Sequence, residues 1–294
     1  MDDHEWLAQR FDEHRSHLRA VAYRMLGSLS EADDAVQEAW LRLSRTDASA
    51  VENLGGWLTT VVARVCLNVL RSRRTRREES LDVHVPDPVV SRLDEIDPEY
   101  EALLADSVGL ALLVVLDTLT PAERLAFVLH DMFAVPFEEI SAIAGRSSGA
   151  TRQLASRARR RVHASAPVQD ASMARQREAV DAFYAAARDG DFDALVAVLD
   201  PDIVLRSDGG DARPGVSQLI RGRAVVAERA LTFARLAPFA RPALINGAAG
   251  VVVVQQGRPV SIMAFTVRDG RIVEINVVAD PVRLDHLDVA TFDD

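Results

Sequence analysis

The hydrophobic pattern of the 294-residue chain changes its period part-way along, and this change most restricts the possible folds. Between Ser30 and Leu43 apolar residues recur every three or four positions, which is typical of an amphipathic helix. Helical patterns continue to about residue 165. Further on, short apolar runs such as "GVVVVQQG" and "VSIMAFTV" favour strands. The sequence therefore predicts a multidomain protein, with two all-α domains followed by an α+β domain.

Local signals predict a helix-turn-helix motif before this change. In "LTPAERLAFVLHDMF", Thr120 is placed to cap a helix and Glu123 to close a capping box. Gly145 can end the following short helix in the left-handed conformation, and the next helix begins at Ser147 or Ser148. A helix, a tight turn and a second helix form the pattern of this motif.

Prolines and glycines mark further divisions of the chain. Residues 79–104 are acidic and contain three prolines with little periodicity, which indicates a linker. Two helices interrupted at Gly190 and a hairpin with an Asp-Gly turn in "FTVRDGRIVEI" indicate the α+β domain. The predicted divisions are a helical domain at 1–78, a Pro-rich acidic linker at 79–104, a helix-turn-helix domain at 105–166 and an α+β domain at 167–294.

Positive charge is concentrated locally in a chain of net charge −10. All 34 basic residues are arginines, and six of them lie between Arg146 and Val162. A second cluster, "RSRRTRRE", ends an earlier helix that has Trp57 near its start. Arginine and glutamine can contact guanine and adenine edges in a major groove, and a basic groove beside an aromatic ring suits single-stranded DNA. The alternative is a solvated helix end, where arginine is also favourable.

Several classes of protein are not favoured. The longest apolar stretch, "LALLVVL" at Leu110–Leu116, is too short to span a bilayer, and the acidic start lacks a secretory signal. One cysteine, Cys66, fits a buried thiol in a cytoplasmic protein. Metal-ligand spacings are absent, so we expect no metal and no cofactor. Histidine is absent between Ala164 and Asp285, which disfavours catalysis in the last domain, where Asp208 is the best acid candidate.

These segments carry a family resemblance. "SEADDAVQEAWLRLSR" and "ENLGGWLTTVVARVCLNVLRSRRTRRE" resemble region 2 of the bacterial extracytoplasmic-function sigma factors, and "LTPAERLAFVLHDMFAVPFEEISAIAGRSSGATRQLASRARRRV" resembles their region 4. The remainder resembles a cone-shaped SnoaL-like α+β domain, a fusion that marks the SigJ-like subgroup. The resemblance implies a non-enzymatic, cytoplasmic factor that binds core RNA polymerase and directs promoter-specific transcription initiation.

The resemblance also implies roles for named residues. The residues expected to read the −35 element are Arg152, Gln153, Ser156, Arg157, Arg159 and Arg160. Those expected at the −10 element are Asn53, Trp57, Arg64, Arg71, Arg73 and Arg74. Those expected to bind core polymerase are Asp33, Asp34, Gln37, Glu38 and Leu41. Independently of the resemblance, Leu41 among acidic residues suggests a partner helix with basic residues and an apolar groove.

Three short motifs partly match motifs of the subgroup, in "HVPDPV", "SDGGDARPG" and "ADPVRL". The first lacks the tryptophan and leucine of the subgroup motif. The second has Asp211 in place of a third glycine, and the third has Asp280 and Arg283 in place of asparagine and lysine. The expected regulatory residues are Pro86, Asp87, Pro88, Asp208, Gly209, Gly210, Asp280, Pro281, Arg283 and Leu284. We expect this last domain to pack on both sigma regions and to regulate their activity.

Two alternatives stay open at this point. The protein could be a helix-turn-helix regulator whose SnoaL-like domain senses a ligand, or one whose SnoaL-like domain is an enzyme. Both leave the first 80 residues without a role, and a small-molecule ligand in the cone is compatible with every alternative. Dependence on core polymerase for tight promoter binding separates the sigma factor from the regulator.

Overall fold

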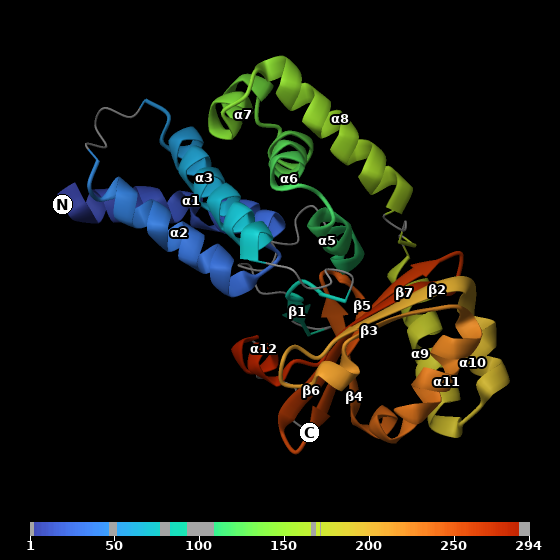
Figure 1. Ribbon diagram of the computed structural model, residues 1–294. Coiled ribbons are helices and arrows are strands. Elements are labelled where there is room, and N and C mark those ends of the chain that lie inside the picture. Colours follow the sequence, from blue (N-terminus) through green and yellow to red (C-terminus); the bar gives the residue numbers. More distant parts are fainter. Residues whose placement is uncertain are drawn as a thin grey trace. The chain divides into compact units, whose positions relative to one another are not determined.

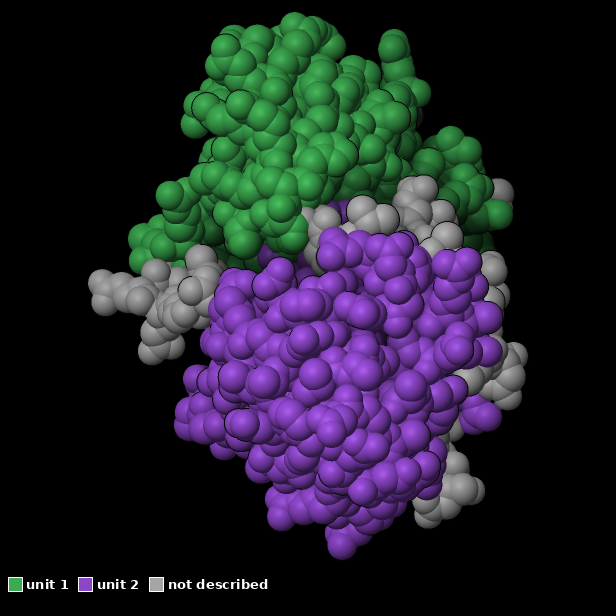
Figure 2. All heavy atoms as spheres, turned by 90° about the vertical axis from the view of Figure 1, so that its right-hand side faces the viewer, with its two compact units in different colours: residues 1–79, 101–106, 115–165 green, residues 80–100, 107–114, 166–294 purple. Residues whose placement is uncertain are grey.

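A computed structural model describes residues 3–46, 52–76, 83–92, 109–165, 169–170 and 172–287 (Figure 1). The chain divides into two compact units, coloured green and purple in Figure 2. The first comprises residues 1–79, 101–106 and 115–165, and the second comprises residues 80–100, 107–114 and 166–294.

The first unit begins with three helices, α1 (Asp3–Leu26), α2 (Leu29–Leu43) and α3 (Leu54–Arg76), which contact one another pairwise. The apolar stripe of α2 is buried as its spacing predicts, and consists of Ala32, Ala35, Val36, Ala39 and Leu43. Cys66 is buried on α3, where burial raises the pKa of its thiol to about 12. This thiol is therefore a small apolar group of the core.

The helix-turn-helix follows. Helix α5 (Leu110–Asp117) precedes α6 (Pro121–Phe127), which continues as a π-helical turn, η2 (Val128–Met132), before α7 (Phe137–Ala144) and α8 (Ser148–Ser165). The capping box of Thr120 and Glu123 is present, and Gly145 ends α7 with a φ of 66°. The local predictions for this motif are confirmed.

The two helical groups of the first unit pack on each other. Helix α3 contacts α6 and α7, and α1 contacts η2. Arg124 is buried, donates from Nε to the carbonyl oxygen of Arg24 at 3.1 Å and pairs with Asp117. The guanidinium of Arg24 lies 4.8 Å from the centre of the Phe133 ring. Two buried arginines thus join the two groups through an ion pair, a hydrogen bond to backbone and a contact with an aromatic ring.

The second unit is an α+β fold around a seven-stranded sheet of order β1-β4-β5-β6-β7-β2-β3. The strands are β1 (Val90–Ser91), β2 (Leu199–Asp208), β3 (Gln218–Arg221), β4 (Ala240–Ile245), β5 (Ala248–Gln255), β6 (Arg258–Arg268) and β7 (Arg271–Val278). Among these seven strands of the described residues, β2 and β7 pair in parallel and the other neighbours pair antiparallel. Helices α9 (Met173–Asp189), α10 (Phe192–Val198) and α11 (Arg223–Thr232) cover one face (Figure 1) and form the main core with it. Two short 3-10 helices, η3 (Pro214–Val216) and η4 (Ala234–Phe239), and a last helix, α12 (Pro281–His286), complete it.

Turn chemistry explains the predicted breaks in this unit. Gly190 ends α9 with a φ of 72°. Asp269 and Gly270 have φ values of 53° and 73° and join β6 to β7, as expected for an Asp-Gly hairpin. The expected α+β fold class of this unit is confirmed.

The segment predicted to be a linker contains part of this sheet. Residues 79–82 and 93–104 lie outside the described residues, but Val85 to Ser91 are buried and β1 pairs with β4. The Asn246 side chain accepts from the N–H of Val89 at 3.1 Å, and the N–H of Asn246 donates to the Val89 carbonyl at 2.8 Å. The middle of the expected linker is therefore an edge strand of the second unit. Prolines and a two-residue strand gave no strand signal in the sequence.

Candidate functional site

Helix α8 exposes polar residues opposite an apolar face. Thr151, Leu154, Ala155, Ala158 and Val162 are buried. Of the six residues expected at the −35 element, Arg152, Gln153, Ser156, Arg157 and Arg160 are exposed and Arg159 is half-buried. This division leaves a basic and amide-bearing surface of the kind that reads a major groove.

Three of these arginines already have acidic partners. Arg152 pairs with Glu138 of α7 at 2.9 Å, Arg157 pairs with Glu123 of α6 at 3.3 Å, and Arg159 pairs with Asp131 of η2. Burial alone would raise the pKa of Glu123, but hydrogen bonds from Thr120 and the charges of Arg161 and Arg157 lower it. Glu123 is therefore an anion at neutral pH. A phosphate that approaches this surface competes with carboxylates for the same guanidinium groups.

The residues expected at the −10 element fall into two groups. Arg64, Arg71 and Arg74 are exposed along α3, and Trp57 is half-buried near its start. The other two have structural contacts that the sequence did not reveal. Asn53 precedes α3 and its Oδ1 accepts from the N–H of Gly56 at 3.0 Å. Arg73 donates from Nη1 to the carbonyl of Leu26 at 2.9 Å and pairs with Glu31. Arg73 therefore connects the end of α3 to α1 and α2.

The surface expected to bind polymerase lies on α2. Asp33, Asp34, Gln37 and Leu41 are exposed there, and Glu38 is half-buried. Two of the carboxylates have neighbours within the helical unit, since Arg19 pairs with Asp33 at 2.7 Å and Arg42 with Glu38 at 2.8 Å. The Leu41 side chain is 40% exposed, which leaves an apolar group among charges.

The expected regulatory motifs converge on one guanidinium group within the second unit. Arg283 of α12 donates from Nε and Nη2 to Oδ1 of Asp87, at 2.9 and 2.6 Å. Its Nη1 donates to Oδ2 of Asp208 at 2.8 Å, and its Nη2 donates to the carbonyl of Val85 at 2.6 Å. One arginine therefore joins the linker segment to the end of strand β2.

Asp208 is the second centre of this cluster. Its Oδ2 also lies 3.1 Å from Nδ1 of His84 and accepts from the N–H of Val85 at 3.1 Å. Burial would raise the pKa of Asp208, but the bonds from His84 and Val85 and the charge of Arg283 outweigh it and lower the pKa to about 2. Asp208 is therefore held as a carboxylate that anchors the linker. We call His84, Asp87, Asp208 and Arg283 the linker clamp.

The remaining regulatory residues shape the surroundings of the clamp. Asp280 caps α12 by accepting from the N–H of Val282 at 3.0 Å, and Pro281 occupies the first turn. Gly210 has a φ of 59°, and a Cβ there would collide with the Asp280 carboxylate. Gly209 is similarly restricted by the Arg213 carbonyl. The burial of the other members, Pro86, Pro88 and Leu284, completes the apolar surroundings.

Comparison with known proteins decides the family. The family models described as "Sigma-70 region 2" and "Sigma-70, region 4" match residues 10–76 and 109–162. The ECF RNA polymerase sigma factor SigJ of Mycobacterium tuberculosis is 39% identical over 284 residues, which cover 92% of this chain and 91% of SigJ. This chain is an extracytoplasmic-function sigma factor. Such a protein binds core RNA polymerase and directs promoter-specific initiation.

Two further matches cover nearly the whole sigma factor. The probable ECF sigma factor SigI of M. tuberculosis is 33% identical over 293 residues, which cover 98% of each chain. The crystal structure of M. tuberculosis SigJ matches with a TM-score of 0.77 and 35% identity, covering 96% of this chain and 99% of that one. The family resemblance drawn from the sequence is confirmed. Within the described residues, no helix of the sigma factor is long and apolar enough to cross a membrane.

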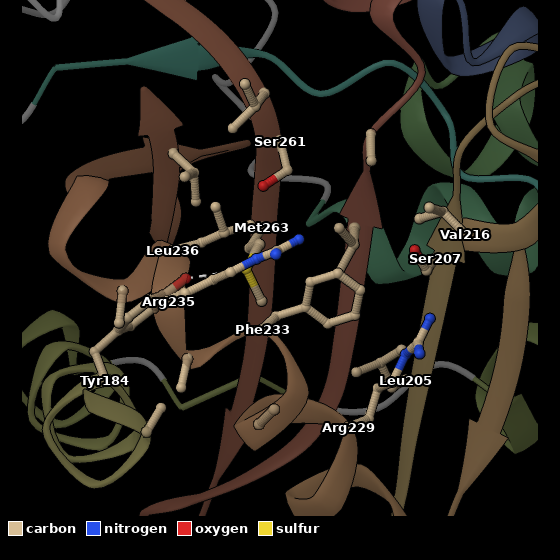
Figure 3. A pocket seen from close by; sticks show the side chains of 18 of the residues that line it. Tyr184, Leu205, Ser207, Val216, Arg229, Phe233, Arg235, Leu236, Ser261 and Met263 are labelled. Atoms are coloured by element: carbon tan, nitrogen blue, oxygen red, sulfur yellow. Dashed lines mark hydrogen bonds between the residues drawn. The ribbon is translucent and has the colours of Figure 1, made fainter. Parts of the chain in front are cut away.

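The second unit of the sigma factor also contains a cavity of about 400 Å³ (Figure 3). It lies among α9, α11, η4 and the covered face of the sheet, and apolar side chains make up most of its wall. Arg213, Arg229 and Arg235 also line it, with Tyr184 among the polar groups. Sequence reasoning missed these residues because arginines are usually solvated and no local pattern places them beside a cavity.

Sequence reasoning also missed His84 and Asn246. A signal existed for His84, which is the first residue of the "HVPDPV" motif. Asn246 lies in a turn with a φ of 50° and is 2% exposed. Its Ile-Asn-Gly context indicates a turn but not a partner in the linker.

Proposed function

We propose that this sigma factor contacts promoter DNA and polymerase through three surfaces of its helical unit. The exposed residues of α8 read the −35 element as duplex. The start of α3 and its exposed arginines hold the −10 element, and the acidic face of α2 with Leu41 binds core polymerase. The observation that carries the proposal is α8, whose apolar face is buried while Arg152, Gln153 and Arg160 stand exposed. Direct readout requires this arrangement.

In the helical unit the DNA-binding helices α3 and α8 lie close together, and we call this arrangement the closed state. Helix α8 packs on α6, and α6 packs on α3. Packed helix axes lie about 10 Å apart, so α8 lies roughly 20 Å from α3. The names of the −35 and −10 elements place them roughly 25 base pairs apart, which is about 85 Å on straight duplex DNA at about 3.4 Å per base pair. The contacts of Arg124 with Arg24 must therefore open before both elements can be bound together.

The C-terminal domain is proposed to regulate this opening through the linker. The linker is the only covalent connection between the two sigma regions. A domain that holds its middle limits how far and in which direction the regions separate. A fused domain also acts at an effective concentration that can reach the millimolar range, so the contact persists even when it is weak. The linker clamp supplies the contact, since Arg283 and Asp208 bind the segment between His84 and Asp87.

Transcription in vitro with core polymerase tests these assignments, using a promoter taken from upstream of the protein's own gene. Full-length protein, Leu41→Glu and Arg283→Met are compared, and core binding is measured alongside. We expect Leu41→Glu to lose core binding and transcription together. We expect Arg283→Met to keep core binding but change promoter activity. Equal transcription by all three proteins would refute the proposal.

A catalytic role for the C-terminal domain is not part of the proposal. Among the described residues, the wall of the cavity contains no aspartate, glutamate or histidine. Acid–base chemistry in such a cone typically uses one of these groups, and burial raises the pKa of the Tyr184 phenol, which makes it a poor base. The cavity is therefore better suited to binding than to catalysis. With core polymerase and promoter DNA as partners, we place the protein in the cytoplasm.

A further inference from the structure

The cavity of the C-terminal domain has the size of a small-molecule site. Its volume is about 400 Å³. Small-molecule sites in proteins measure about 300–1,000 Å³ and combine an apolar wall with a few polar groups that fix orientation. Phe183, Phe233, Leu236, Val253 and Met263 contribute to the apolar part of this wall. The occupant therefore has an apolar body.

The charged groups of the wall are all positive. Arg229 comes from α11 and Arg235 from η4, and Figure 3 shows both among the side chains that surround the cavity. In the part of the chain that the structure describes, no carboxylate forms an ion pair with either arginine. The Arg229 guanidinium lies 4.7 Å from the centre of the Phe233 ring, which orients it without neutralising it. Two cations without acidic partners beside an apolar cavity favour an anionic group on the occupant.

Arg213 differs from these two. Its Nη1 donates to the carbonyl of Ala279 at 3.3 Å and to that of Val260 at 3.5 Å. Its hydrogen bonds are therefore partly used by backbone. Arg213 contributes positive potential to the cavity but is less free to form a fork with an anion.

Tyr184 supplies an uncharged donor. Its hydroxyl group donates to the Met263 sulfur at 3.0 Å, drawn as a dashed line in Figure 3. Burial raises the pKa of Tyr184, so the phenol stays protonated. A thioether is a weak acceptor, and a carboxylate oxygen in reach would be a better one.

We propose that this cavity binds an organic monocarboxylate with an apolar chain or ring, whose carboxylate is held by Arg229 and Arg235. Guanidinium groups match the planar geometry of a carboxylate and bind it through paired hydrogen bonds. The apolar wall then covers the body of the ligand, and Tyr184 donates a further hydrogen bond. This site is additional to the DNA and polymerase surfaces, and its existence does not depend on them.

The position of the cavity gives its occupant access to the linker clamp. Ser207 and Ala279 line the cavity, and the next residues along the chain, Asp208 and Asp280, lie at or beside the clamp. Successive side chains of a strand point to opposite faces, so Ser207 faces the cavity while Asp208 binds the linker. The N–H of Ala279 donates to the Asp208 carbonyl at 2.8 Å, which joins the two segments. A ligand that contacts Ser207 and Ala279 therefore contacts the same two segments that hold the linker.

Isothermal titration of the full-length protein tests the proposal, with decanoate, decanol and decyl phosphate as probes. We expect decanoate to bind with one-to-one stoichiometry and at least tenfold more tightly than decanol. Arg229→Met and Arg235→Met keep an apolar side chain but remove the charge, and each should weaken decanoate about tenfold while decanol changes less than twofold. Arg223→Met is the matched control, because Arg223 is exposed on the same helix α11 and does not line the cavity.

A further variant fills the space. Ala230→Trp adds a large side chain to the cavity wall and should abolish decanoate binding, while circular dichroism and thermal unfolding show that the fold is kept. Equal affinities for decanoate and decanol would overturn the proposal, as would unchanged decanoate affinity in both arginine variants. A preference of tenfold or more for decyl phosphate over decanoate would identify a phosphate site instead. Absence of decanoate binding would also refute the proposal. These titrations contain no polymerase or DNA, so a negative result leaves the sigma-factor assignment intact.

Discussion

Replacing Arg283 by methionine should release the linker segment from the C-terminal domain. Methionine keeps much of the apolar stem but removes every donor of the guanidinium group. The lost bonds are two to Asp87, one to Asp208 and one to the Val85 carbonyl. Two carboxylates would then face each other without the cation that lies between them.

The burial of the three charged groups sets the magnitude. The side chains of Arg283, Asp87 and Asp208 are 20%, 12% and 10% exposed. Removing one partner of a buried ion pair costs about 3–5 kcal/mol, and the residual exposure favours the lower end. A loss of about 3 kcal/mol in the free energy of linker docking corresponds to roughly a hundredfold change in the docking equilibrium.

Amide hydrogen exchange measures this change directly. The N–H of Val85 donates to Asp208, and that of Val89 donates to Asn246. We expect protection of both amides to fall about a hundredfold, while the amides of the central strand β5 stay protected. The control variant is Arg271→Met, which changes an exposed arginine at the start of β7 and should leave the protection of both amides unchanged.

A paired substitution separates lost attraction from uncompensated charge. Asp87→Asn combined with Arg283→Met removes one of the two facing carboxylates and should recover part of the protection, with a coupling of about 0.5–3 kcal/mol. Unchanged protection of Val85 and Val89 in Arg283→Met would refute the reasoning. Loss of protection throughout β5 would show that Arg283 supports the whole domain rather than the linker.

The other predictions concern the DNA surface, the polymerase surface and pH. Arg152→Ala and Gln153→Ala should each cost about 1–3 kcal/mol and relax the preference for the −35 sequence, measured with holoenzyme on promoter variants; an equal loss on every sequence would mean phosphate contact only. Leu41→Glu should abolish binding to core polymerase in a pull-down while circular dichroism is unchanged, and retained affinity would contradict the assignment. The pKa of Asp208 is lowered from 3.8 to about 2, so the stability contributed by its ionised form is complete above pH 3.8 and lost as the pH falls towards 2. The difference in unfolding free energy between the wild type and Asp208→Asn should therefore shrink as the pH falls from about 4 to about 2, and a difference that stays constant over this acid range would count against it.

Features fixed by neighbours in the sequence were predictable. The capping box joins Thr120 to Glu123 across three residues, and the hairpin of Asp269 and Gly270 closes on adjacent strands. The buried stripe of α2 follows from helical periodicity alone. In each case the residues that determine the feature lie within one helical turn, one helix or one hairpin of each other.

Features that depend on distant partners were not predictable from the local sequence. Asp87 and Arg283 are 196 positions apart, and Arg124 and the Arg24 carbonyl are 100 apart. The motif resemblance placed Asp87, Asp208 and Arg283 in one regulatory group, but no pattern shows which atoms meet. Arg73 is a second example. Its place in a basic helix end suggested a DNA contact, whereas its side chain contacts the Leu26 carbonyl and Glu31 within the helical unit.

The two departures from the subgroup motif at the end of the chain can be judged by the bonds they make. Asp280 caps α12 through a side-chain oxygen, which the asparagine of the motif could also do, since both residues are strong N-caps. Arg283 replaces a lysine, and its planar fork reaches two carboxylates and a carbonyl at once. A lysine ammonium is a compact charge on a flexible stem and cannot form the same fork. The bonds that hold the linker segment in this chain therefore depend on an arginine at position 283, and a lysine there should hold the segment less firmly.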